Sequence, residues 1–176
     1  VARTQGSEGL AEVARRSRRS DDLRAWCRAL VEAGDWTAAR GAYEEAADLV
    51  EDRAYARGDF LDGAALAAQE LGSDNLDAAL ERAWREAPSL SRLRRWLGGC
   101  STQEELAARA GAALDVVPAG AARQRALLHV LRGELEAAAT LLANARGLGW
   151  SDAEHPGHLV FPIFVTLLGG AKVTVQ

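Results

Sequence analysis

The chain has 176 residues, a net charge of −4 and 48% hydrophobic residues, which suits one domain with a packed core and excludes a disordered chain. The acidic balance argues against general binding to a polyanion such as nucleic acid. Alanine is the most abundant residue while Tyr, Phe and Ile are scarce, so the composition predicts an all-α fold.

Several classes of protein are also excluded by the distribution of apolar residues and cysteines. The longest apolar run, residues 159–168, contains Pro162 and is too short to cross a membrane. No secretory signal is visible, and two cysteines suit a reducing compartment, so we expect a cytoplasmic protein. Arginine supplies nearly all of the basic charge and methionine is absent, which we interpret as part of a larger bacterial protein.

Apolar periodicity together with start and stop signals predicts ten helices. Pro88 and Pro118 lie where one pair of helices is expected to end and the next to begin. Asp74 with Asp77, and Ser101 with Glu104, resemble capping arrangements, the second a full capping box. The expected helices cover residues 7–17, 20–33, 36–51, 56–71, 74–87, 89–98, 102–115, 118–132, 134–147 and 157–169. The helix over 20–33 carries an apolar stripe of Leu23, Trp26, Cys27, Leu30 and Val31.

Two segments share a pattern of turn and helix residues. Each begins with Gly and an acid, has a small residue five positions after the Gly, and a bulky residue four positions later. Gly permits a tight turn, the acid suits a helix start, and the small residue lets a partner helix approach. We therefore predict that both glycines lie at bends between paired helices. The shared residues are Gly34, Asp35, Ala39, Tyr43 and Ala46 in one copy, and Gly133, Glu134, Ala138, Leu142 and Ala145 in the other.

The two copies lie 99 residues apart, close to three periods of about 34 residues. The pattern resembles the turn and second helix of the tetratricopeptide repeat (TPR), with weaker copies from Asn75 and Gln103. This resemblance implies an irregular, right-handed stack of about four helical hairpins with a C-terminal capping helix. Second helices are expected to start at residues 36, 74, 102 and 134.

This parsing also divides the chain. Residues 1–19 are expected to form a partly helical lead segment, and residues 20–150 the TPR-like helical-repeat domain. Residues 151–176 would supply a cap helix and a tail that belong to the same domain. Pro162 suits only the first turn of that cap helix.

Few residues suggest catalysis or metal binding. His155 and His158, near Asp152 and Glu154, could hold a metal in an enzyme, but no zinc-ligand spacing supports this. We interpret the cluster as a polar turn before the cap helix. Cys27 lies in an apolar stripe, where burial is the default. We predict no enzymatic activity, no cofactor and no metal.

The charge pattern of the paired helices is more informative. The helices over 89–98 and 118–132 carry arginines and no acidic residue. Their partner helices, over 102–115 and 134–147, carry more acidic residues than arginines. In a TPR-like stack the first helices line the concave groove, so the resemblance implies a basic groove for an acidic peptide or partner segment. The alternative is that these arginines form ion pairs within the stack or contact solvent. The candidate partner-binding residues are Arg92, Arg95, Arg123 and Arg125.

A second hypothesis is a regulatory protein that acts on nucleic acid. It would use Arg15 to Arg19, or the segment 102–118, whose first ten residues resemble the first helix and turn of a helix-turn-helix domain. The residues after Gly111 are apolar and acidic, unlike a recognition helix, so nucleic acid is the less favoured partner.

Overall fold

The computed structural model describes residues 2–50, 54–145, 147, 149, 151, 152, 155 and 157–170. Every regular element within these ranges is an α-helix, which confirms the all-α prediction, and each of the expected helices is found. In chain order they are α1 (Ala2–Ser17), α2 (Ser20–Glu32), α3 (Trp36–Leu49), α4 (Ala54–Glu70), α5 (Leu76–Glu86), α6 (Leu90–Leu97), α7 (Gln103–Val116), α8 (Ala122–Leu131), α9 (Leu135–Leu142) and α10 (Gly157–Gly170).

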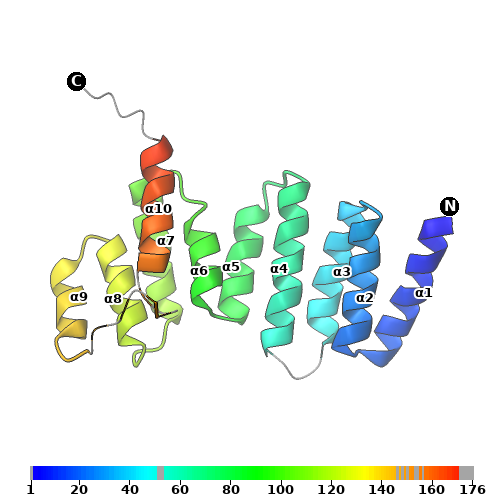
Figure 1. Cartoon of the computed structure of the whole chain (residues 1–176), viewed down its shortest axis with the longest axis horizontal. Helices are drawn as coiled ribbons and strands as arrows, with labels where there is room; N and C mark the ends of the chain where they lie inside the picture. Colours follow the sequence, from blue (N-terminus) through cyan, green and yellow to red (C-terminus); the bar gives the residue numbers. More distant parts are fainter. Residues whose placement is uncertain are drawn as a thin grey trace. The chain divides into compact units, whose positions relative to one another are not determined.

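The chain forms two compact units, one ending at Arg92 and the other beginning at Leu93, so the division falls inside α6. In the first unit α1 packs against α2, α2 against α3, α3 against α4, and α4 against α5. In the second unit α8 packs against both α7 and α9. Consecutive helices lie side by side from α1 to α5 in the first unit and from α7 to α9 in the second (Figure 1), as the prediction of helical hairpins requires.

The core of the first unit combines large side chains from α2 with small ones from α3. The apolar stripe of α2 is buried as its spacing predicts, and the buried residues of α3 are all alanines. Because alanine is short, the backbone of α3 can approach its neighbours closely. These residues are Leu23, Trp26, Cys27 and Leu30 in α2, and Ala39, Ala42, Ala46 and Ala47 in α3.

The helices α3 and α4 approach each other closely at Tyr43 and Gly63. A Cβ atom built on Gly63 would lie 2.4 Å from the Cε1 atom of Tyr43, so a larger residue would displace the ring. Tyr43 lies one turn after Ala39 and packs against the core.

Three connections between paired helices use the same hydrogen-bonded turn. Gly34 has a φ of +72°; its N–H donates to the carbonyl three residues earlier at 2.9 Å, and the N–H of Asp35 donates to the carbonyl five residues before it at 3.1 Å. Gly72 and Gly133 have φ of +59° and +78°. Each of them and the residue that follows it donate the same two hydrogen bonds, to the carbonyls three and five residues earlier. This is the Schellman motif, whose left-handed residue favours glycine. The prediction that Gly34 and Gly133 lie at bends is confirmed.

Arginine–carboxylate pairs in the first unit link each of the helices α1 to α4 to the helix two places further along the chain. The guanidinium of Arg15 in α1 binds the carboxylate of Glu45 in α3 through two hydrogen bonds of 2.6 and 2.8 Å. The linked residues are 30 to 35 positions apart in the sequence. The other links are Arg24 of α2 with Asp59 of α4, Asp48 of α3 with Arg82 of α5, and Arg92 of α6 with Asp59 and Asp62 of α4.

Two predicted helix starts need correction. The hydroxyl of Thr102 accepts a hydrogen bond from the N–H of Glu105 at 3.1 Å, and the Glu105 carboxylate accepts one from the N–H of Ser101 at 2.8 Å. The capping box therefore lies one residue later than predicted, because α7 begins at residue 103. The expected cap by Asp74 is not formed, since Asn75 is the N-cap residue of α5 and its side chain makes no capping bond.

The helices α8 and α9 are shorter than predicted. The helix expected from Pro118 begins only at residue 122, because the N–H of Ala121 closes a turn onto the Pro118 carbonyl at 3.0 Å. The helix expected to reach residue 147 ends at Leu142, where the N–H of Ala145 bonds back to the Leu142 carbonyl at 2.9 Å. The glycines that follow, including Gly147, disfavour further helix.

The apolar α10 departs from the predicted cap in two respects. Pro162 lies in the second turn of the helix rather than in the first, so α10 has one fewer internal hydrogen bond. Leu135 and Leu142 of α9 are 64% and 41% exposed, so α10 leaves these side chains of the last hairpin uncovered.

Candidate binding site in the second unit

A cavity of about 460 Å³ lies among α8, α9, α10 and the chain that connects α9 to α10. Its volume falls within the range typical of small-molecule sites. Most of the lining is apolar, and two side chains with polar nitrogen atoms, Arg123 and His155, also line it. The apolar side chains among the described residues are those of Ala126, Leu127, Val130, Leu142, Ala145 and Val160.

One wall of the cavity is a single face of α8. Arg123, Ala126, Leu127 and Val130 follow one another at i, i+3, i+4 and i+7, the spacing that places residues on one side of a helix. Arg123 lies in the first turn and Val130 in the last, about 10 Å apart along the helix axis. This wall therefore begins with a cation and continues as hydrocarbon.

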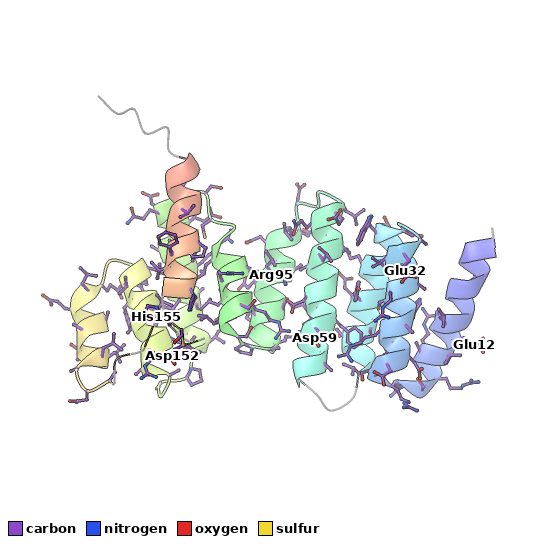
Figure 2. All side chains as sticks on the ribbon, in the orientation of Figure 1. Glu12, Glu32, Asp59, Arg95, Asp152 and His155 are labelled. Carbon is purple, nitrogen blue, oxygen red and sulfur yellow. The ribbon has the colours of Figure 1, made fainter. Side chains whose placement is uncertain are left out.

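The helix α10 brings its polar residue to the same end. Both α8 and α10 run upward in Figure 1, and α10 begins higher than α8. His155 lies just before α10, at its lower end (Figure 2), and Val160 follows one turn into the helix. The first turn of α8 and the residues just before α10 thus supply the polar groups, and the rest of α8 and the first turn of α10 supply apolar ones.

Local hydrogen bonds fix the protonation pattern of His155. Its Nδ1 atom accepts a hydrogen bond from the N–H of Gly157 at 3.0 Å. Because Nδ1 is an acceptor, the neutral ring carries its proton on Nε2. The ring of His158 meets it edge-on, with 5.9 Å between centroids, and the His155 N–H donates to the Asp152 carbonyl at 2.9 Å. The turn holds His155 as a donor at Nε2.

A second hollow of about 320 Å³ lies at the beginning of α8. Residues 120–124 and Ala145 line it, and it shares Arg123 and Ala145 with the larger cavity. Arg123 is thus common to both hollows. The charge pattern of its helix made Arg123 a candidate in the sequence. The contribution of α10 to the cavity depends on tertiary structure, and no sequence pattern predicts it.

Of the other three predicted partner-binding residues, Arg92 lies in the first unit and is buried, at 7% exposure. Its guanidinium donates to the carboxylate of Asp62 at 2.8 Å, to that of Asp59 at 3.2 Å and to the carbonyl of Ala87 at 3.0 Å. A Cβ atom on Gly58 would lie 2.8 Å from its Cζ atom, so the side chain is tightly enclosed. Arg92 therefore matches the ion-pair alternative and not an anion site open to solvent.

Arg95 and Arg125 lie in the second unit, and both are half-buried. One Nη atom of Arg125 donates to the carbonyls of Leu114 and Val117 at 2.9 and 2.8 Å, which satisfies acceptors at the end of α7. Arg95 projects from α6 (Figure 2). Arg125 therefore holds α8 against α7, a role that the charge pattern did not predict.

The surroundings of the histidines and cysteines do not favour metal binding or nucleophilic catalysis in the described part of the chain. Within the ranges that the structure describes, no three His, Cys, Asp or Glu side chains are grouped so that they could hold a metal ion. Burial raises the pKa of Cys27 to about 12, so its thiol is protonated at neutral pH, and Cys100 is also buried. The Nδ1 atom of His129 lies 2.6 Å from the carboxylate of Glu134.

The structure bears on both segments considered for nucleic-acid binding. Arg15 binds Glu45 and lies over the ring of Trp26, 4.9 Å from its centroid. A helix-turn-helix over 102–118 would need a turn at Gly111, but α7 runs unbroken through that residue.

No helix in the described part of the chain combines the length and the apolar character that a membrane crossing requires. Comparison with protein-family models, with curated proteins and with solved structures finds no match to this chain. Its function is therefore inferred from its own geometry.

Proposed function

We propose that this chain is a non-enzymatic protein-interaction module, a TPR-like right-handed stack of helical hairpins that belongs to a larger bacterial protein. The ion pairs between each of the helices α1 to α4 and the helix two places further on carry this proposal. In a stack of hairpins, first helices lie next to first helices and second helices next to second helices. The separation of 30 to 35 residues corresponds to one repeat.

The shared turns support the same arrangement. Gly34, Gly72 and Gly133 each follow what would be the first helix of a hairpin, namely α2, α4 and α8. A left-handed residue at that point reverses the chain so that the second helix can pack against the first. The second helices begin at residues 36, 76 and 135, close to the predicted positions.

We propose that the partner is an acidic peptide segment, which binds the second unit through Arg95 and Arg123. These residues lie on α6 and α8, which contain no acidic residue and would be first helices of the stack. Arg92 and Arg125 support the fold through their internal contacts. The nucleic-acid alternative has less support, because Arg15 is bound to Glu45.

The test is a selection from a random peptide library displayed on phage, with the purified full chain as bait. Enriched peptides are then synthesised and their dissociation constants measured by fluorescence anisotropy at about 50 mM and about 300 mM salt. We expect acidic peptides whose affinity falls with salt and falls about tenfold or more in the Arg95→Ala/Arg123→Ala variant.

A matched variant, Arg16→Ala/Arg85→Ala, removes two exposed charges from the first unit and should change the affinity by less than about twofold. If both double variants weaken binding equally, net charge rather than a site explains the affinity. If no acidic peptide is enriched, the proposed function is wrong.

A further inference from the structure

The helix α1 carries two large apolar side chains on a surface that is open to solvent. It lies at one end of the first unit and packs against α2 (Figure 1), with Ala11 and Ala14 buried. On another face of the helix, Leu10 and Val13 are 37% and 42% exposed. They lie one turn apart, so they form one continuous apolar surface. Contact with another molecule would remove this surface from water, which favours association.

The residues of this face have a spacing that is the same in both chain directions. Four exposed residues lie along it, separated by four, three and four positions: Gly6, Leu10, Val13 and Ser17. We call these four residues the α1 stripe. When a second α1 is laid antiparallel on the first, Leu10 lies opposite Val13 and Gly6 lies opposite Ser17. Each copy then offers the other the same surface, as a two-fold symmetric interface requires.

The ends of the α1 stripe leave room for a second helix. A Cβ atom built on Gly6 would meet nothing within 4 Å, and Ser17 at the other end also has a small side chain. Small residues let two helix backbones approach closely, while Leu10 and Val13 between them supply the apolar contact. The helix has 16 residues and is about 24 Å long, so the contact area is small for a specific interface.

The charges along α1 favour the antiparallel arrangement over the parallel one. The exposed acids Glu8 and Glu12 (Figure 2) precede the exposed Arg16 near the end of the helix. Neither Glu12 nor Arg16 has an ion-pair partner within the part of the chain that the structure describes. In the antiparallel pair, Arg16 is displaced along the helix axis by about 7.5 Å from Glu12 of the second copy, and by about 13.5 Å from the second Arg16. A parallel pair in register would place the two Arg16 side chains together, where they repel.

We propose that α1 is the contact surface for a second copy of this chain, which binds as an antiparallel, two-fold symmetric pair of α1 helices. Leu10 packs against Val13 of the second copy, and Arg16 is attracted by Glu12 of the second copy. The dimer is weak, because the contact is small. The interface uses the first unit alone, so it is independent of the peptide site proposed for the second unit.

The experiment is sedimentation equilibrium of the full chain at concentrations from about 5 µM to about 500 µM. We expect the average mass to rise from that of one chain toward that of two chains. Val13→Glu should raise the dissociation constant of the dimer at least about tenfold, because a carboxylate would face Leu10 of the second copy. Leu66→Glu is the matched control, since Leu66 on α4 is also 42% exposed, and it should change the dissociation constant by less than about twofold.

An exchange of charges tests the orientation without touching the apolar residues. Arg16→Glu should weaken the dimer about threefold or more, because the acids of the two copies then repel. The double variant Glu12→Arg/Arg16→Glu should restore the original dissociation constant within about twofold. Circular dichroism checks that each variant keeps its helices.

Three results would overturn the proposal. The chain could remain monomeric over the whole concentration range. Val13→Glu could have no more effect than Leu66→Glu, which would place any self-association on another surface. The double exchange could dimerise no better than Arg16→Glu alone, which would exclude the antiparallel pairing of the two helices.

Discussion

The hairpin between α2 and α3 depends on a left-handed glycine, and replacing Gly34 with alanine tests this directly. The φ of Gly34 is +72°, a region that costs an L-amino acid roughly 1–2 kcal/mol. A Cβ atom there would meet nothing within 4 Å, so no steric clash adds to this cost. The loss of chain entropy in the unfolded state offsets about 0.4–1 kcal/mol. We therefore expect Gly34→Ala to lower the free energy of unfolding by about 1 kcal/mol.

Gly41, in the middle of α3, provides a matched control on the same hairpin. It is exposed, a Cβ atom there also meets nothing within 4 Å, and no positive φ is found at this residue. The same substitution should therefore raise the free energy of unfolding by about 0.8–1 kcal/mol, the helix preference of alanine over glycine. The two variants should differ by about 2 kcal/mol although each adds one methyl group.

Urea denaturation followed by circular dichroism measures the free energy of unfolding of both variants. In thermal denaturation, the midpoint temperature should shift by about 2–4 °C per kcal/mol for a chain of this size. If Gly34→Ala is as stable as the unmodified chain, or if both substitutions stabilise it, the bend at residue 34 is not left-handed. The hairpin prediction would then lose its main local support.

Three further predictions concern polar contacts. Arg92→Ala should lower the free energy of unfolding by about 2–3 kcal/mol, because three hydrogen bonds from a buried guanidinium are lost. Thr102→Ala should cost about 1 kcal/mol through loss of the N-cap, whereas Ser101→Ala should cost only a few tenths. The hydrogen bond from Arg15 holds the pKa of Glu45 below that of an ordinary glutamate, so its stabilisation is fully present above the ordinary pKa and is lost as the pH falls through the lowered pKa. Glu45→Gln should therefore destabilise the chain by less than about 1 kcal/mol at neutral pH and have no effect near pH 2.

Chemical denaturation, repeated at several pH values for Glu45→Gln, measures the free energy of unfolding of these variants. A different result would contradict each prediction. An Arg92 variant with unchanged stability would mean that this side chain is exposed to solvent in solution. Equal losses at Ser101 and Thr102 would mean that α7 begins one residue earlier. A constant effect of Glu45→Gln down to pH 2 would exclude the ion pair with Arg15 as its cause.

The helices and their turns were predictable because they depend on residues close together in the sequence. The stripe that includes Leu23 and Trp26 requires only helical spacing, and the bend at Gly34 requires only a residue that tolerates a positive φ. The end of α9 was harder, because Ala143 and Ala145 favour helix while Gly147 opposes it. The start of α7 was displaced by one residue because Ser101 and Thr102 are both good N-cap residues.

The candidate site was only partly predictable. Its cation, Arg123, follows from the charge pattern of one helix, and the apolar residues on the same face follow from its periodicity. His155 was noticed as a metal candidate, but its place beside α8 depends on how α10 returns along the unit. No local pattern specifies that contact.

The arginines show why charge within one helix is an incomplete guide to binding. Arg92 has two acids 30 and 33 residues earlier, on α4, and pairs with both. Arg125 has no acid between residues 90 and 95 or between residues 155 and 160, and donates instead to the carbonyls at the end of α7. In a stack of hairpins, positions one repeat apart are neighbours, so the acids that decide the partner of an arginine lie about 34 residues away. The same charge on α6 and α8 therefore produces an ion pair in one helix and a helix cap in the other.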